Sequence, residues 1–151
     1  MNGKSVFIDL TRCEACGKCQ LACRQWKKLP ASGEEPSVSP DGAADLDENT
    51  LKRVLIARAV VDGEPHWLFF PEQCRHCLIP QCKIAADWQV KGATVRDDET
   101  GTVLFTDKPR YLDYRSIRTH CRYDIPRQHP PPGVLFKCHM CLDPMRHGLA
   151  P

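Results

Sequence analysis

The most constraining segment of this chain lies near its N-terminus, where four cysteines follow one another at short spacing. They form the pattern C-x2-C-x2-C-x3-C, with Cys13, Cys16, Cys19 and Cys23. This spacing is typical of [4Fe–4S] ligands, because three cysteines on a tight loop bind three irons of one cube. The fourth cysteine, one helical turn further on, points away and reaches a neighbouring cube. One motif therefore predicts two nearby clusters, and two nearby clusters indicate electron transfer.

The composition agrees with a domain that inorganic clusters help to fill. The chain has 151 residues, of which 10 are cysteine, 13 are proline and only 7% are aromatic. The formal charge of +2 gives no indication of a nucleic-acid partner, since each four-thiolate cluster would add negative charge. Disulfides are a weaker interpretation of the cysteines, because C-x2-C neighbours seldom suit structural disulfide geometry.

A second cysteine group has the loop ligands of one cluster but lacks the outward ligand of the next. Its members are Cys74, Cys77 and Cys82, and the position of a fourth is occupied by Ala86. A lone cysteine, Cys121, supplies an outward ligand, but its segment lacks the three loop ligands. Counted back by the same spacing, its loop positions are Tyr111, Tyr114 and Ile117.

These two deficits are complementary, and together they predict one complete cluster and one lost cluster. If the two segments form one half of the fold, Cys74, Cys77, Cys82 and Cys121 bind one cluster, called cluster C. The companion site would then be lost. Its four positions are expected to be filled by Ala86, Tyr111, Tyr114 and Ile117.

The remaining sequence predicts short elements between the cysteine groups. A strand is expected over Ser5–Leu10, a helix over Cys19–Lys28 and a surface loop over 30–50. Two hairpins are expected, Leu51–Val61 with His66–Phe70 and Thr94–Arg96 with Thr102–Thr106. A short helix is expected near Leu112–Thr119 and a proline-rich loop over Gln128–Gly133. Trp26, Trp67, Phe69 and Phe70 are expected in the core. The repeated order of cysteine loop, helix and hairpin predicts a ferredoxin-like α+β fold.

Four segments resemble the iron–sulfur β subunit of soluble tungsten- or molybdenum-dependent formate dehydrogenase. They are W-L-F-F-P-E-Q-C-R-H-C (67–77), G-T-V-L-F-T (101–106), Y-D-I-P-R (123–127) and K-C-H-M-C (137–141). The resemblance covers nearly the whole chain. It implies a ferredoxin-like polycluster iron–sulfur fold with two pseudo-symmetric halves and loop insertions. The implied first half is 1–29 with 128–151, the second is 68–127, and 30–67 is an insertion of loop and hairpin.

The resemblance also implies ligand sets for three [4Fe–4S] clusters. Cluster A would use Cys13, Cys16 and Cys19, and cluster B would use Cys23, Cys138 and Cys141. For each of these two, the fourth ligand is expected beyond the end of the chain at Pro151. Clusters A and B are therefore expected to lose iron on oxidation more easily than cluster C.

The function implied is an electron-transfer subunit without a catalytic site of its own. Its partner would be a large molybdopterin subunit, carrying tungsten or molybdenum, that oxidises formate to CO2 or runs the reverse. Electrons would pass to a soluble acceptor or a further subunit. The chain has no signal region or membrane span, so export folded on the partner's signal to the periplasm is expected, with a cytoplasmic complex as the alternative.

Two other functions stay open at this point. The same role in another molybdopterin oxidoreductase fits the same cysteine order. A zinc-binding interaction module would use Cys-x2-Cys pairs with His76, His120 or His139, although the cysteine triplets hold too many close thiolates for one tetrahedral site. His76 and His139 lie between cysteines and are expected to shape the loops rather than to bind iron.

Overall fold

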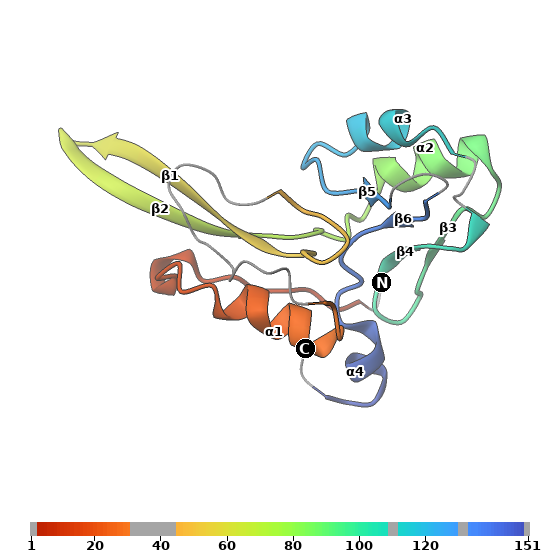
Figure 1. Ribbon diagram of the computed structural model, residues 1–151, viewed down its shortest axis with the longest axis horizontal. Helices are drawn as coiled ribbons and strands as arrows, with labels where there is room; N and C mark the ends of the chain where they lie inside the picture. The colour runs from red at the N-terminus through yellow and green to blue at the C-terminus, as the bar shows by residue number, and fades with distance from the viewer. Residues whose placement is uncertain (1–2, 31–44, 109–111, 130–132, 150–151) are drawn as a thin grey trace. The chain divides into compact units, whose positions relative to one another are not determined.

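The computed structural model describes residues 3–30, 45–108, 112–129 and 133–149 (Figure 1). By its internal contacts the chain divides into two units. The N-terminal unit is Phe7–Gln73, and the C-terminal unit is Cys74–Pro151 together with Met1–Val6. Each unit is described by itself below. The predicted boundaries of the two pseudo-symmetric halves stay a prediction, since a division by contacts does not test symmetry.

The N-terminal unit begins with a short 3-10 helix and a cysteine-bearing α-helix. The 3-10 helix η1 spans Leu10–Arg12, and the carboxylate of Asp9 accepts from the backbone N–H of Thr11. The expected strand over Ser5–Leu10 was wrong, because residues 5–9 belong to no strand or helix and Leu10 begins η1. Helix α1 spans Lys18–Trp26 and confirms the predicted helix.

A long two-stranded hairpin completes the N-terminal unit. Strands β1 (Arg53–Val61) and β2 (Glu64–Glu72) pair antiparallel in one register along their whole length (Figure 1). The turn confirms the prediction: Asp62 and Gly63 have φ of 54° and 84°, as a two-residue hairpin turn of type I′ requires. The amide of Val54 donates to the side-chain oxygen of Gln20 at 3.2 Å, which ties β1 to α1.

Two aromatic residues expected in the core are instead exposed. The side chains of Trp26 and Trp67 are each 53% exposed, and the hairpin tip also exposes Val60 at 70%. For Trp67 the expectation was wrong because the outer part of a two-stranded hairpin has no layer of its own to pack against. Trp26 is the last residue of helix α1 and lies outside the hairpin. Phe69 and Phe70, nearer the base of the hairpin, are half-buried.

The C-terminal unit mixes short helices with two small sheets. Its elements are α2 (Gln81–Gln89), β3 (Thr94–Arg96), β4 (Val103–Phe105), α3 (Tyr114–Thr119), β5 (Arg127–Gln128), β6 (Leu135–Phe136) and α4 (Leu142–Arg146). Strands β3 and β4 pair as the second predicted hairpin, and α3 confirms the predicted short helix. The β5–β6 pair was not predicted within the proline-rich segment. Gly133 permits it, since a Cβ there would overlap the carbonyl group of His129.

The core of the C-terminal unit lies between α2, α3 and the small sheets. Its buried members are Ala85, Ala86, Ala93, Leu112, Ile117 and Leu135, with Cys82, Val90, Phe105 and Tyr114 packed against them. Helix α2 contributes both to this core and to the cysteine site described next. No helix in the described ranges combines the length and the apolar character that crossing a membrane needs.

Candidate iron–sulfur sites

Four cysteines from two distant segments of the C-terminal unit line one pocket. They are Cys74, Cys77, Cys82 and Cys121, the predicted ligands of cluster C. All four are half-buried. The pocket continues into a cleft of about 360 Å³ to which Cys77, Cys82 and Cys121 also contribute. The structure thus brings Cys121 to the second cysteine group, as the complementary deficits predicted.

A tight loop presents the first two of these cysteines. His76 has φ of 46°, a left-handed conformation that is costly for a residue with a side chain. Its backbone N–H donates to the sulfur of Cys74 at 3.4 Å, and its ring Nδ1 accepts from the N–H of Val103 at 3.0 Å. A backbone N–H directed at sulfur in this way suits the anionic ligand of an iron–sulfur site. The expectation that His76 shapes the loop is confirmed by these two contacts.

Burial and the ring's contacts make His76 a poor ligand for a metal ion. Burial and the positive charge of Lys137 lower the pKa of His76 to about 3, so the ring is neutral at pH 7. Since Nδ1 accepts from Val103, the ring proton resides on Nε2. Both ring nitrogens therefore lack the free lone pair that zinc would need.

Cys82 stands in the first turn of α2, where burial disfavours its thiolate. Burial raises the pKa of Cys82 to about 11, and nearby Cys74, Cys121 and Cys77 raise it further while Lys137 lowers it. Thiolates this close repel one another, and cationic iron would relieve that repulsion. The donor set, all sulfur and arranged around a pocket, fits a [4Fe–4S] cluster. Within the described ranges, no three His, Cys, Asp or Glu side chains are placed to hold a single metal ion.

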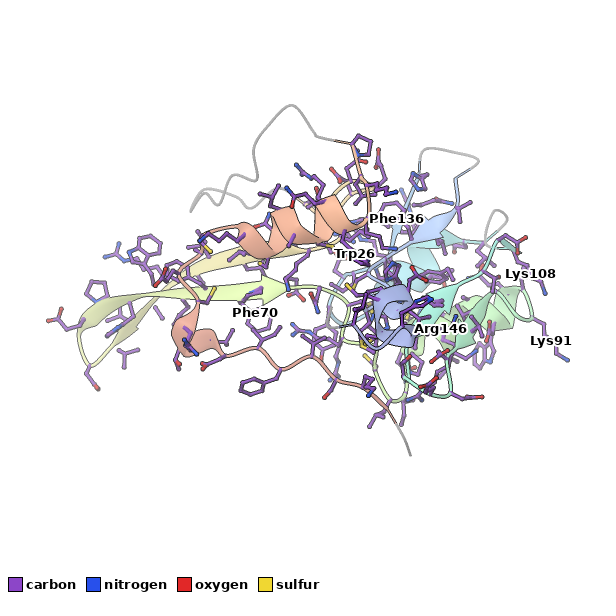
Figure 2. The ribbon with its side chains drawn as sticks, turned by 90° about the horizontal axis from the view of Figure 1, so that it is seen from below. Trp26, Phe70, Lys91, Lys108, Phe136 and Arg146 are labelled. Carbon is purple, nitrogen blue, oxygen red and sulfur yellow. The ribbon has the colours of Figure 1, made fainter. Side chains whose placement is uncertain are left out.

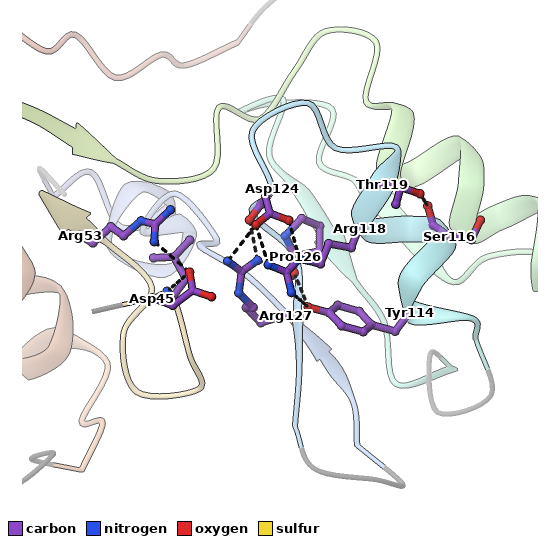
Figure 3. A network of polar contacts seen from close by, with 10 residues as sticks. Asp45, Arg53, Tyr114, Ser116, Arg118, Thr119, Asp124, Pro126 and Arg127 are labelled. Atoms are coloured by element: carbon purple, nitrogen blue, oxygen red, sulfur yellow. Dashed lines mark hydrogen bonds and ion pairs between the residues drawn. The ribbon is translucent and has the colours of Figure 1, made fainter. Parts of the chain in front are cut away.

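A network of charged side chains holds the turn that carries Cys121 (Figure 3). Both carboxylate oxygens of Asp124 accept from the guanidinium group of Arg118, and one also lies 3.3 Å from Nη2 of Arg127. The amide of Asp124 donates to the carbonyl of Cys121 at 2.8 Å. Arg127 is 6% exposed, so the network is anchored inside the protein. Since Asp124 bonds directly to this turn, its ion pairs help to hold the main chain at Cys121.

Three arginines near the pocket have different surroundings. Arg75 stacks over the ring of Tyr123 with 4.8 Å between the guanidinium carbon and the ring centre. Arg127 pairs with Asp124. Arg122 is exposed at the cleft.

Cys138 and Cys141 occupy a second loop of the C-terminal unit with the same local turn. The residue before Cys141, Met140, has φ of 56°, and its N–H donates to the sulfur of Cys138 at 3.3 Å. Helix α4 begins directly after Cys141. Nε2 of His139 lies 3.9 Å from Asp143. The loop geometry therefore repeats that of Cys74–Cys77.

The first cysteine group lies in the N-terminal unit. Cys13 and Cys19 are half-buried, Cys16 is exposed, and Cys19 and Cys23 lie one turn apart on α1. Ala15, which precedes Cys16, has φ of 54°. The residue before the second cysteine is therefore left-handed in the Cys13–Cys16, Cys74–Cys77 and Cys138–Cys141 segments, at Ala15, His76 and Met140. The joint ligation of one cluster by Cys23 with Cys138 and Cys141 stays a prediction.

The positions expected to replace a lost cluster lie in the hydrophobic core. Ala86 and Ile117 are 0% exposed, and Tyr114 packs against the same core. The hydroxyl of Tyr114 donates to the carbonyl of Pro126 at 3.2 Å. Tyr111 lies outside the described residues. Apolar side chains fill this region together, as expected of a site refilled without ligands.

The sequence interpretation missed Lys137. Its ammonium group contacts the sulfur of Cys74. In the sequence, however, a lysine before a C-x2-C pair is indistinguishable from an ordinary surface residue. No pattern in the sequence indicates that it reaches a cysteine 63 positions away.

Comparison with known proteins shows the family of this chain. Residues 65–151 match the family model of the 4Fe-4S dicluster domain. The formate dehydrogenase subunit beta of Megalodesulfovibrio gigas is 44% identical over 98% of this chain and 69% of its own length. The chain belongs to the formate dehydrogenase β-subunit family. Other similar members are the formate dehydrogenase 2 subunit beta (cytochrome c-553) of Nitratidesulfovibrio vulgaris and the formate dehydrogenase-O iron-sulfur subunit of Escherichia coli.

These two relatives show how far the similarity extends. The Nitratidesulfovibrio vulgaris protein is 41% identical over 98% of this chain and 69% of its own length. The Escherichia coli protein is 26% identical over 96% of this chain and 47% of its own length. The Escherichia coli relative is named as an iron–sulfur subunit of formate dehydrogenase-O. The chain is thus an iron–sulfur electron-transfer subunit with a 4Fe-4S dicluster domain.

Proposed function

We propose that this chain carries electrons between a formate-oxidising catalytic subunit and an electron acceptor. The observation that carries the proposal is the pocket lined by Cys74, Cys77, Cys82 and Cys121. Its four cysteines offer sulfur donors from two distant segments around one pocket, as a [4Fe–4S] cluster requires. The names of the relatives support formate as the substrate of the partner.

Three [4Fe–4S] clusters form the proposed relay, in a ferredoxin-like fold of two pseudo-symmetric halves. Cluster C has the four cysteines of the pocket. Cluster A has Cys13, Cys16 and Cys19, and cluster B has Cys23, Cys138 and Cys141. The repeated left-handed turn before Cys16, Cys77 and Cys141 supports a cluster loop at each place.

In this relay the clusters, the cysteine loops and the apolar core each have a separate role. The clusters, when bound, accept and release one electron at a time at potentials of roughly −700 to +450 mV across known proteins. The cysteines hold each cluster, and the inward N–H groups of His76 and Met140 stabilise charge on sulfur. The apolar core at Ala86 and Ile117 excludes water from one side of the Cys82 helix.

The partner is a large molybdopterin subunit that carries tungsten or molybdenum. Oxidation of formate there yields CO2, a proton and two electrons, which enter this chain one at a time. The acceptor is a soluble electron carrier or a further subunit. The proposed location is the periplasm, reached folded on a twin-arginine signal of the large subunit, and a large-subunit gene without that signal would place the complex in the cytoplasm.

Formate-dependent reduction of the purified complex tests this function. The full chain is isolated without oxygen through an affinity tag, and co-purifying subunits are identified by mass spectrometry. Formate is then added while the visible absorbance of the clusters is followed. Bleaching by formate supports the proposal, and the Cys121→Ala variant should show a smaller change.

Two other results would overturn it in distinguishable ways. Bleaching by dithionite but not by formate would assign the chain to another molybdopterin oxidoreductase. A colourless protein that contains zinc would instead identify a zinc-binding interaction module.

A further inference from the structure

The side chain of Lys137 joins the loop of Cys138 to the pocket of cluster C. Its ammonium nitrogen lies 3.4 Å from the sulfur of Cys74 and 3.3 Å from the carbonyl oxygen of Cys138. It also donates to the carbonyl oxygen of Val103 on β4. Lysine has three N–H donors, and these contacts use all three.

The surroundings of Lys137 leave its positive charge directed at sulfur. The side chain is half-buried and lines the pocket together with the four cysteines. Across the ranges that the structure describes, no carboxylate lies within ion-pair distance of it, and its other two partners are neutral carbonyls. In a partly buried site of lowered dielectric, such a charge interacts strongly with nearby thiolates.

The ammonium group reaches the cluster site through a single ligand, because the sulfur of Cys74 lies 3.4 Å from its nitrogen. Reduction of a cluster by one electron adds one negative charge. A fixed ammonium group beside a ligand sulfur therefore stabilises the reduced form, and hydrogen bonds to sulfur act in the same direction.

We propose that Lys137 is a positioning residue for cluster C, which orients the Cys74 thiolate and raises the reduction potential of that cluster. The inference rests on the proposed function, because it requires a cluster at Cys74, Cys77, Cys82 and Cys121. The next residue, Cys138, is a predicted ligand of cluster B. The main chain of the Lys137–Cys138 pair thus connects two predicted ligand sets.

Redox titration followed by electron paramagnetic resonance tests the proposal on the cluster-loaded complex. The variants are Lys137→Met, which removes the charge and the donor, and Lys137→Arg, which keeps both. Lys91→Met is the control, because Lys91 extends from the surface of the same unit (Figure 2). The signal of cluster C is identified as the one that disappears in Cys121→Ala.

The expected result is a shift in the reduction potential of cluster C alone. Lys137→Met should lower the equilibrium constant for reduction of cluster C about tenfold, which corresponds to about 59 mV for one electron. Lys137→Arg should stay closer to the unchanged protein, and Lys91→Met should have no effect. An unchanged potential in a Lys137→Met protein with full iron content would overturn the inference, as would an equal shift in Lys91→Met.

Iron content distinguishes a failure of the proposed function from a failure of the role proposed for Lys137. If the unchanged protein binds no iron, the proposed function itself is wrong. If Lys137→Met fails to assemble cluster C, the comparison of Lys137→Arg with Lys137→Gln decides, since Gln keeps an N–H donor without charge. Equal potentials in those two variants would then contradict the role of the charge.

Discussion

The carboxylate of Asp97 accepts a hydrogen bond from the guanidinium group of Arg146 at 2.6 Å, although the two residues are 49 positions apart. This contact joins the turn between β3 and β4 to helix α4. The same carboxylate accepts from the N–H and the hydroxyl of Thr100 at 2.8 and 2.7 Å. One aspartate therefore orders the turn and anchors the helix that follows Cys141.

Acid should remove the stabilisation by Asp97 in a defined pH range. Hydrogen bonds from Thr100 and Arg146 lower the pKa of Asp97 from 3.8 to about 2. A lowered pKa in the folded state means that the stabilisation is complete above about pH 4 and is lost as the pH falls toward 2. Asp97→Asn should therefore be less stable than the unchanged chain by a constant amount from pH 7 to pH 4, measured by urea unfolding.

Asp98→Asn is the matched control for that measurement, because Asp98 is exposed beside Asp97. It should change stability by no more than about 0.5 kcal/mol. Equal effects of the two substitutions would show that general charge, rather than the contact with Arg146, is responsible.

Removing Cys121 should abolish cluster C and leave the iron of clusters A and B in place. The other three ligands of the pocket would then leave one iron without a protein ligand. Total iron and the resonance spectrum of the anaerobically purified protein measure the loss. Cys121 in reactive thiol form within an iron-replete complex would contradict the ligand set.

Ala86→Cys is the converse test, and it should add no iron. Ala86 is 0% exposed in the core, and Tyr114 and Ile117 offer no thiolates. The larger side chain should instead destabilise the C-terminal unit by about 1–3 kcal/mol through overpacking. A gain of iron in this single variant would show that other residues complete the companion site.

Glycine should have opposite effects at two alanines of the N-terminal unit. Ala15 has φ of 54°, where an alanine is strained by about 1–2 kcal/mol, so Ala15→Gly should stabilise the loop. Ala22 lies within helix α1, and Ala22→Gly should destabilise by about 1 kcal/mol. Unfolding in urea measures both changes. Destabilisation by both substitutions would mean that the left-handed turn at Ala15 carries no strain.

Truncation of Ile117 should weaken the core beside Cys82. Ile117 is 0% exposed, and Ile117→Ala should cost about 2–5 kcal/mol of unfolding free energy. Ile84→Ala on helix α2 is the control, because Ile84 is 38% exposed and should cost at most about 1 kcal/mol. Similar losses at both positions, measured by chemical denaturation, would contradict the assignment of the core.

Local signals predicted much of the secondary structure. The Asp62-Gly63 pair predicted the long hairpin, because both residues tolerate positive φ. The meeting of Cys121 with Cys74, Cys77 and Cys82 was predicted by counting which ligand each segment lacked. The exposure of Trp67 was not predicted, because burial on a strand depends on how many layers cover the hairpin. The exposure of Trp26, at the end of helix α1, was not predicted either.

Other features depend on contacts between distant residues and leave no local pattern. The strands β5 and β6 are only two residues each, too short for an alternating pattern. The contact of Lys137 with Cys74 likewise arises only once β4 and the Cys138 loop lie side by side. The assignment of Cys13, Cys16, Cys19, Cys23, Cys138 and Cys141 to clusters A and B stays a prediction.

The left-handed turn that precedes Cys16, Cys77 and Cys141 has a consequence for divergence within such proteins. An alanine, a histidine and a methionine occupy this one backbone position at Ala15, His76 and Met140. At His76 and Met140 the main chain, not the side chain, donates to sulfur. Mutation can therefore alter the polarity around one cysteine loop while its sulfur geometry is inherited unchanged, so that three loops of common design acquire different chemical character independently.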